Sequence, residues 1–189
     1  MAVTLQRIPR PELDVLASFG VPERLANSVA AGALPPAFIA QRAMRQQDAG
    51  MPELWCSTFY IVRNGDGVVV GSCGFKDAPT CGQIEIGYGV APTCRNLGIA
   101  TEAVRELCRL AFANAEIRAV LAQVSAANVS SSRVVEKLAF EKGETKVDLN
   151  GESLVQWVSR RGHDVGVTAP TENDAAPCSA VRAAARPSR

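Results

Sequence analysis

Two apolar runs separated by Asn64-Gly65-Asp66-Gly67 constrain the fold of this chain more than any other feature of its sequence. Residues 54–62 and 68–75, on either side of this tetrapeptide, are rich in β-branched and aromatic side chains. Asn-Gly and Asp-Gly readily adopt the backbone conformations that tight hairpins require. The pattern therefore predicts two antiparallel strands near the centre of the chain.

Strands and helices are also predicted on both sides of this hairpin. Apolar alternation predicts strands over residues 3–8, 84–90 and 120–124, and a last hairpin over about 143–159 that turns at Asn150-Gly151. Helical spacing predicts one or two helices within 12–31, and further helices over 37–48, 98–114 and about 129–139. The 189 residues are enough for one domain.

The composition changes after Arg161. Residues 162–189 hold three prolines, many alanines and no aromatic residue, with almost no periodicity. Such a segment buries too little apolar surface to offset the entropy of ordering it. We therefore expect one domain over residues 1–161 and a disordered tail over 162–189.

Charge and composition exclude several classes of function. Twenty basic residues against nineteen acidic ones give a net charge of +1, which argues against nucleic acid as a partner. No apolar run is long enough to cross a membrane, and the first residues lack the apolar core of a secretion signal, so we expect a cytoplasmic protein. The six cysteines include no C-x-x-C pair and the only histidine is His163, so we expect neither a metal site nor a Ser-His-Asp or Cys-His mechanism.

The strand over 84–90 leads through a short loop directly into the helix over 98–114. Unpaired backbone N–H groups and the positive end of the helix dipole make such a junction a site for anions. Gly98 lets a phosphate approach without meeting a Cβ, and Arg95 adds a charge. No G-x-x-x-x-G-K-[ST] motif is present, and a G-x-G-x-x-G loop after a first strand is absent too. What remains is the motif R-x-x-G-x-A.

This motif resembles the acetyl-CoA pyrophosphate loop of the GNAT superfamily of N-acetyltransferases. Ile84-Glu85-Ile86-Gly87-Tyr88 and Ala100-Thr101-Glu102-Ala103 are similar to the E-I-G-Y strand and the A-T-E-A helix start of its ribosomal-protein-alanine acetyltransferases. The segment 128–140 is similar to their N-x-x-S-x-R-V-x-E-K-x-G-F pattern. The resemblance is strong over residues 68–141 and extends to 3–67 by the order of the elements alone.

The resemblance implies an α+β fold and a binding site for acetyl-CoA as co-substrate. The sheet is then mixed and mostly antiparallel, with about seven strands, flanking helices, and strands four and five splayed apart. The pantetheine arm of the coenzyme lies in that gap. The residues implied to bind it are Gly89 and Val90 by their backbone, the pyrophosphate loop Arg95, Asn96, Leu97, Gly98, Ile99, Ala100 and Thr101, and Asn128. Asn128 is also suited to cap the following helix, and the two roles are compatible.

The resemblance also implies catalytic roles for two residues. Glu85 occupies a position where the family often has its general base, and Val90 N–H would donate to the oxyanion. Alternatively, Glu85 only pairs with a structural partner or faces solvent. Many relatives protonate the leaving thiolate with a tyrosine, where this chain has Val135. Ser131 is then a candidate to assist, either directly or by contacting the coenzyme.

The function expected is transfer of the acetyl group of acetyl-CoA to a primary amine by direct attack in a ternary complex. The alternative is a catalytically degenerate module that binds acyl-CoA for regulation. The acceptor is an amine, either a protein N-terminus or a small molecule, and a homodimer is compatible with the sequence. Phe38, Trp55, Phe59 and Trp157 are aromatic candidates for the acceptor side, although such positions more often belong to the core.

Overall fold

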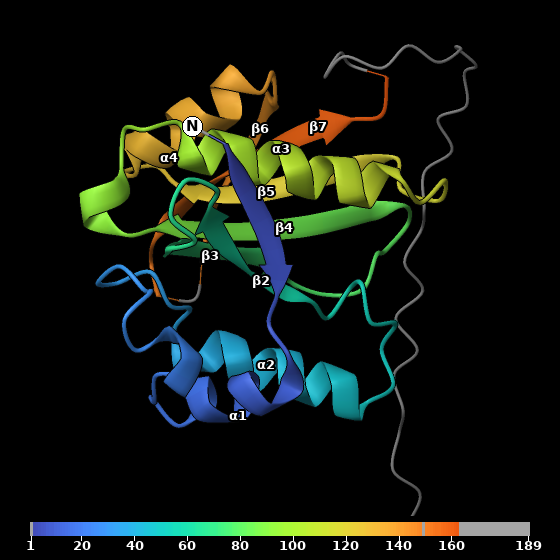
Figure 1. Ribbon diagram of the computed structural model, residues 1–189. Helices are drawn as coiled ribbons and strands as arrows, with labels where there is room; N and C mark the ends of the chain where they lie inside the picture. Colours follow the sequence, from blue (N-terminus) through green and yellow to red (C-terminus); the bar gives the residue numbers. More distant parts are fainter. Residues whose placement is uncertain (1, 149, 163–189) are drawn as a thin grey trace, which may run out of the picture.

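The computed structural model describes residues 2–148 and 150–162 as a single sheet with helices on both of its faces (Figure 1). Most of the predicted tail, residues 163–189, lies outside the described residues. In chain order the elements are β1 (Val3–Arg7), α1 (Arg10–Ala17), the 3₁₀ turn η1 (Glu23–Leu25), α2 (Ala37–Asp48), β2 (Thr58–Arg63), β3 (Val69–Phe75), β4 (Gln83–Val90), the 3₁₀ turn η2 (Pro92–Cys94), α3 (Ile99–Phe112), β5 (Ala119–Ser125), α4 (Val129–Lys137), β6 (Glu141–Val147) and β7 (Ser153–Arg160).

The seven strands pair in the order β1-β2-β3-β4-β5-β7-β6. Every neighbouring pair is antiparallel except β4 and β5, which run parallel and are connected through α3. The hairpin predicted around Asn64–Gly67 is present as β2 and β3, and the hairpin predicted at Asn150-Gly151 is present as β6 and β7. The α+β fold class predicted from the sequence is therefore confirmed.

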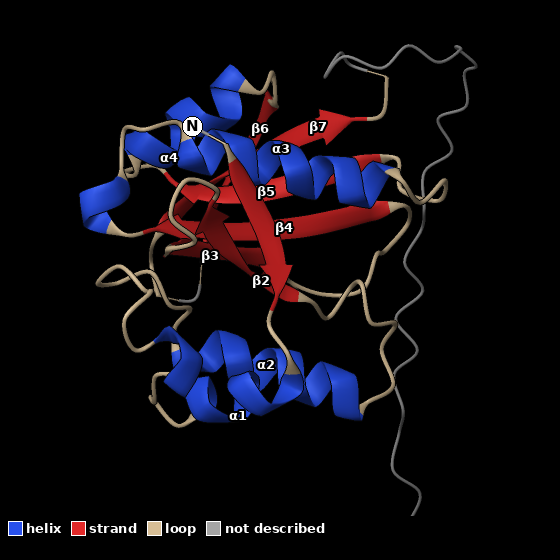
Figure 2. Ribbon diagram, viewed as in Figure 1, coloured by secondary structure: helices blue, strands red, loops and turns tan. Residues whose placement is uncertain are grey.

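Helices α1 and α2 pack together on one face of the sheet, whereas α3 and α4 cover the other face (Figure 2). The buried side of α3 carries small and branched residues at helical spacing, among them Ala103, Val104 and Leu107, each fully buried. In the chain, β4 precedes α3 and β5 follows it. The packing of α3 on the sheet therefore bears on the position of both parallel strands.

Two expected element boundaries are displaced. The strand expected from residue 54 starts at Thr58, because residues 52–57 form turns in which the Trp55 N–H donates to the Pro52 carbonyl. Trp55 is still buried, and its ring packs edge-to-face against Phe75 with the two ring centroids 5.3 Å apart. The helix expected within 12–31 ends at Ala17, before Phe19 adopts a left-handed φ of 61°.

Within the described part of the chain, no helix combines the length and apolar character needed to cross a membrane.

Candidate active site

Strands β4 and β5 separate halfway along their length. Their pairing runs from Gln83 opposite Ala119 to Ile86 opposite Ala122 and then stops, although β4 continues to Val90 and β5 to Ser125. This is the splay that the sequence resemblance predicted. A cleft of about 900 Å³ occupies the opening, lined by the ends of both strands, the loop before α3, the start of α4 and one side of α2.

The backbone of β4 is left with unpaired groups on the open side. The Lys76 N–H donates to the Glu85 carbonyl at 2.8 Å, and the Ala91 N–H donates to the Val70 carbonyl at 2.9 Å. Because alternate residues of a strand face the same neighbour, Gly89 is directed to β3, while Tyr88 and Val90 direct their N–H and C=O groups to the gap. The Arg95 guanidinium approaches the Val90 carbonyl at 3.5 Å, so the Val90 N–H is the open donor.

Gly89 therefore belongs to the cleft in a different way from Val90. A Cβ added at Gly89 would meet no atom within 4 Å, so the glycine leaves open space on the face that carries Glu85 and Gly87. A side chain at this position would fill the cleft. The contribution of the Gly89 backbone to coenzyme binding stays a prediction, and the structure adds that the absence of a side chain keeps this part of the cleft open.

The loop before α3 forms the candidate phosphate site. Gly98 immediately precedes the helix with a left-handed φ of 77°, and no side chain caps the first turn. The first N–H groups of α3 are therefore free to receive an anion. A Cβ on Gly98 would meet nothing within 4 Å, which is consistent with an open approach to these donors. Asn96 also has a left-handed φ, of 61°, as its residue type allows.

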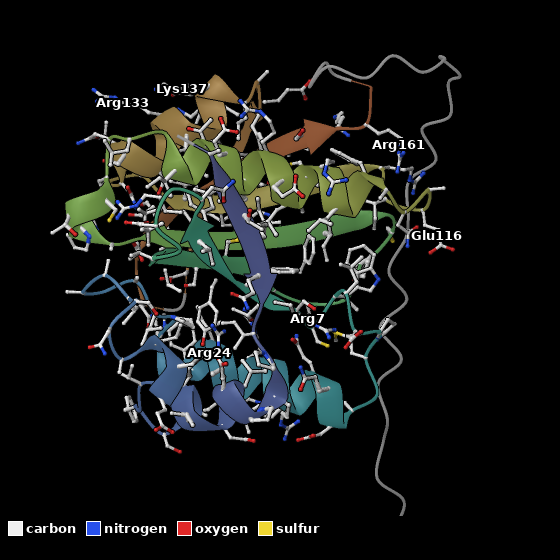
Figure 3. The ribbon with its side chains drawn as sticks, viewed as in Figure 1. Arg7, Arg24, Glu116, Arg133, Lys137 and Arg161 are labelled. Carbon is white, nitrogen blue, oxygen red and sulfur yellow. The ribbon has the colours of Figure 1, made fainter. Side chains whose placement is uncertain are left out.

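Six of the seven predicted loop residues line the cleft: Arg95, Asn96, Gly98, Ile99, Ala100 and Thr101. The seventh, Leu97, is not among the lining residues, and its side chain is 43% exposed. Farther along the same side of the cleft, Arg133 and Lys137 project from α4 (Figure 3) and also line it. The loop and α4 thus combine backbone donors with three basic side chains.

Asn128 and Ser131 meet at the N-terminus of α4. The Asn128 side-chain oxygen accepts a hydrogen bond from the Ser131 N–H at 3.0 Å, so the helix-capping role is present in the structure. Both residues line the cleft. The Tyr88 hydroxyl donates to the Ser131 carbonyl at 3.1 Å and so connects β4 to α4 across the gap. Val135 is fully buried behind them.

Tyr88 is a functional candidate to which sequence reasoning gave no role. Burial raises the pKa of its hydroxyl, an effect that hydrogen bonding to Ser131 opposes. The phenol therefore holds its proton at neutral pH, within the cleft and next to Ser131. The E-I-G-Y motif already contained this residue, and strand alternation places it on the face opposite Glu85. That alternation was the signal available in the sequence.

Glu85 is held by two neighbours. One carboxylate oxygen lies 2.5 Å from the Lys76 ammonium, and the other accepts from the Gln123 amide at 3.3 Å. Its side chain is 24% exposed, and Lys76 and Gln123, rather than Glu85 itself, are among the residues that line the cleft. The structure thus has the ion pair of the alternative interpretation. The carboxylate lies one side chain behind the cleft wall.

Helix α2 supplies the remaining wall of the cleft. This α2 wall consists of Leu34, Pro36, Phe38, Ile39 and Arg42. One turn beyond Arg42, the Gln46 amide donates to the Lys76 carbonyl at 2.9 Å and ties the helix to the end of β3. Among the four aromatic candidates, only Phe38 lines the cleft and is exposed; the other three, Trp55, Phe59 and Trp157, are buried in the core.

The sequence patterns assigned no role to Lys76 or Arg42, although both line the cleft. Lys76 faces Glu85 across the β3–β4 connection, a pairing that depends on the register of an irregular loop. Arg42 lies four residues after Phe38, so helical spacing alone could have placed both on one wall. No group of three or more histidine, cysteine, aspartate or glutamate side chains within residues 2–148 and 150–162 is arranged to hold a metal ion.

Residues 19–141 match the family described as an acetyltransferase (GNAT) domain. No curated protein matches the chain significantly.

Several solved structures have a similar fold. A ribosomal-protein-S5-alanine acetyltransferase from Vibrio fischeri is 13% identical with a TM-score of 0.62, over 86% of this chain and 95% of that one. RimL, a ribosomal L7/L12 α-N-protein acetyltransferase, is 15% identical with a TM-score of 0.61, over 85% and 94%. Aminoglycoside acetyltransferase AAC(6')-Ib in complex with coenzyme A is 21% identical with a TM-score of 0.59, over 85% and 95%.

Proposed function

The chain belongs to the GNAT family of acetyltransferases, and on this basis we propose that it transfers the acetyl group of acetyl-CoA directly to a primary amine in a ternary complex. The observation that carries the proposal is the continuity between the gap of β4 and β5 and the uncapped start of α3. A long thiol cofactor with a pyrophosphate needs such an extended channel with an anion site at one end.

We propose that the coenzyme lies along this channel. The pyrophosphate is bound by the N–H groups at the start of α3 and by Arg95, while Arg133 and Lys137 offer further positive charge. The pantetheine arm fills the gap, where it pairs with the Tyr88 backbone in place of a neighbouring strand, and the Val90 N–H stays available for the thioester oxygen. Asn128 contacts the arm from the N-terminus of α4 while it continues to cap that helix.

The reaction needs a neutral amine, a stabilised oxyanion and a proton for the leaving group. The amine nitrogen forms a bond to the thioester carbonyl carbon, and the resulting oxyanion is bound by the Val90 N–H. Collapse of this intermediate breaks the carbon–sulfur bond and releases the thiolate of CoA. The proton lost by the amine goes to Glu85 through one water, since the carboxylate lies behind the cleft wall.

The leaving thiolate takes its proton beside α4. In the cleft, the Tyr88 hydroxyl donates a hydrogen bond to the Ser131 backbone carbonyl, and the Tyr88 phenol is protonated at neutral pH. A thiolate with a pKa near 8.5 is also a tolerable leaving group without a dedicated acid. The buried Val135 therefore does not prevent turnover.

A second candidate function is binding of acyl-CoA without catalysis. The Lys76–Glu85 ion pair and the apolar Val135 favour it, because both remove groups that a proton-transfer mechanism uses. The channel itself serves either function equally.

An acceptor screen separates the two functions. Release of CoA is followed with a thiol reagent while peptides, free amino acids, polyamines and aminoglycosides are offered with acetyl-CoA. We expect at least one class of amine to stimulate release well above hydrolysis in buffer. Tight binding of acetyl-CoA by calorimetry, together with no stimulation by any amine class, would instead establish the binding module.

A further inference from the structure

The Arg42 guanidinium is exposed to the cleft without an anionic partner. Arg42 is half-buried on the α2 wall, its Nε is shielded from solvent with no hydrogen-bond acceptor, and no carboxylate of the described residues forms an ion pair with it. Burial lowers the pKa of this guanidinium, which nevertheless stays protonated as arginine does in proteins. An N–H of a cationic group that is shielded from solvent and has no acceptor is costly, so the site is suited to receive an anion.

The charged residues around Arg42 do not supply the missing acceptor. Asp77 and Glu85 attract it from a distance and Arg45 repels it. Glu85 is already paired with Lys76, and Asp77 accepts from Gln46. Among the described residues that line the cleft, none is acidic, and five are basic: Arg42, Lys76, Arg95, Arg133 and Lys137.

The position of Arg42 separates it from the expected coenzyme phosphates. Arg95, Arg133 and Lys137 belong to the loop and helix on the α3 and α4 side of the sheet, whereas α2 packs on the opposite side (Figure 1). An anion at Arg42 therefore belongs to whatever enters from the α2 side. In the proposed reaction, that molecule is the amine.

We propose that the acceptor amine carries a carboxylate, which Arg42 binds through its guanidinium. This inference rests on the proposed acetyl transfer. A planar guanidinium fits a carboxylate with two parallel hydrogen bonds. One helical turn earlier, the 62% exposed ring of Phe38 offers an apolar surface to the rest of the acceptor. Polyamines and aminoglycosides carry several positive charges, and the charged side chains of the described residues that line the cleft are all basic as well. These amines are therefore expected to be poor acceptors.

Matched acceptors test the proposal. Leucine is compared with leucinamide, and a peptide beginning Ala-Asp with one beginning Ala-Asn, each at saturating acetyl-CoA. The carboxylate member of at least one pair should have a kcat/KM at least tenfold higher. The two pairs distinguish a free amino acid from an acidic peptide as the source of the carboxylate. Equal values within both pairs, or a preference for the neutral members, would overturn the proposal.

Variants of Arg42 connect the preference to this side chain. Arg42→Gln should lower kcat/KM for the carboxylate acceptor at least tenfold, mainly through KM, and should lower it far less for the neutral acceptor. Arg42→Lys should recover part of the loss because it retains the charge. Arg45→Gln makes the same change on the same helix, at an exposed residue outside the cleft, and should have no effect. An equal loss for both acceptors, or weaker acetyl-CoA binding by Arg42→Gln, would assign Arg42 another role.

A binding measurement distinguishes failure of this proposal from failure of acetyl transfer. Calorimetry on the protein saturated with CoA should detect leucine or the Ala-Asp peptide but not its neutral counterpart, and Arg42→Gln should abolish the difference. Carboxylate-dependent binding without turnover would uphold the Arg42 site and overturn the proposed enzyme. Turnover of neutral or polycationic amines without a carboxylate preference would uphold the enzyme and overturn the Arg42 site.

Discussion

At the scale of single residues, the Lys76–Glu85 ion pair is the feature on which the proposed proton transfer depends most. Glu85 lies where β4 and β5 are still paired, two residues before Gly87, which lines the cleft. Lys76, 36% exposed, stands between the carboxylate and the cleft. A water beside Lys76 could reach both the amine and Glu85, whereas a purely structural pair would only hold the end of β3 against β4.

Replacing Glu85 by Gln distinguishes these roles. As a base, Glu85→Gln should lower turnover at neutral pH by roughly 10²-fold, the usual range for a positioned base, and leave acetyl-CoA affinity nearly unchanged. The deficit should shrink at high pH, where more of the amine is already neutral. A pH–rate profile of both proteins measures this. Turnover like that of the wild type at pH 7 would reduce Glu85 to a structural residue.

Lys76→Met is the matched control for that experiment. It removes the cation and keeps a long side chain, so it breaks the ion pair but leaves the carboxylate in place. The base role predicts a smaller loss of turnover for Lys76→Met than for Glu85→Gln. Equal losses that do not vary with pH would show that the pair acts as a unit to position the acceptor.

At the scale of elements, the loop and the start of α3 form the coenzyme site in this account. Gly98→Asp places a Cβ and a carboxylate in the open space where we propose the phosphates. The repulsion should weaken acetyl-CoA at least tenfold, about 1.4 kcal/mol. Calorimetry measures this. Gly50→Asp is the matched control, because Gly50 has a similar φ of 74° and equally open surroundings. Unchanged affinity in a folded Gly98→Asp protein would contradict the loop assignment.

The end of α4 provides a prediction about stability. Ala139 follows this helix with a left-handed φ of 55°, a conformation that costs any residue with a Cβ. Ala139→Gly should therefore stabilise the domain by about 0.5–1 kcal/mol, since relief of this strain outweighs the added freedom of the unfolded chain. Urea unfolding would detect it as a higher midpoint at constant slope. A lower midpoint would show that the methyl group contributes more than the strain.

Elements were predictable where a single local pattern determines them. The helix expected at residues 37–48 is α2 with the same limits, and the two Asn-Gly hairpins fall where their turns require. The start of β2 was wrong because Trp55 has the composition of a strand residue but packs from a turn. Propensity does not report such tertiary packing.

The candidate site was predictable to the same degree as its motifs. The loop residues 95–101 and Asn128 each belong to a local sequence motif, and all of them except Leu97 line the cleft. Arg42 and Lys76 approach the site from other elements, so their positions depend on how α2 and the β3–β4 connection pack. Whether a charged side chain has a partner is a property of that packing and not of the local sequence.

At the scale of the whole molecule, β7 is the last strand of the chain; it ends at Arg160, and Arg161 follows it. The Arg161 guanidinium donates to the carbonyls of Ile117 and Asn114 and lies 5.5 Å from the centre of the Phe112 ring. We propose that the domain ends here and that the predicted tail contributes neither to folding nor to coenzyme binding.

Truncation tests this boundary. A chain ending at Gly162 should keep acetyl-CoA affinity and a thermal midpoint within about 2 °C of the full chain, which corresponds to a stability change of no more than about 1 kcal/mol. A chain ending at Ser159 loses Arg160 and Arg161 and should unfold several degrees lower. A large drop for the chain ending at Gly162 would show that residues 163–189 dock on the domain.

Direct transfer between two bound substrates is the central claim about the whole molecule. In the proposed reaction, the coenzyme and the amine enter from opposite sides of the sheet and meet at the gap between β4 and β5. An acyl-enzyme would need a nucleophile there, and burial raises the pKa of the Cys73 thiol that lines the cleft, so this thiol stays protonated. The protonated state of this thiol favours attack by the amine on acetyl-CoA itself, as we propose.

Initial rates of CoA release, measured while acetyl-CoA and a productive amine are varied together, test this claim most directly. Direct transfer predicts double-reciprocal lines that intersect, because both substrates must be bound before CoA leaves. Parallel lines, together with CoA released in a burst before the amine is added, would reveal a covalent acetyl-enzyme and contradict the account.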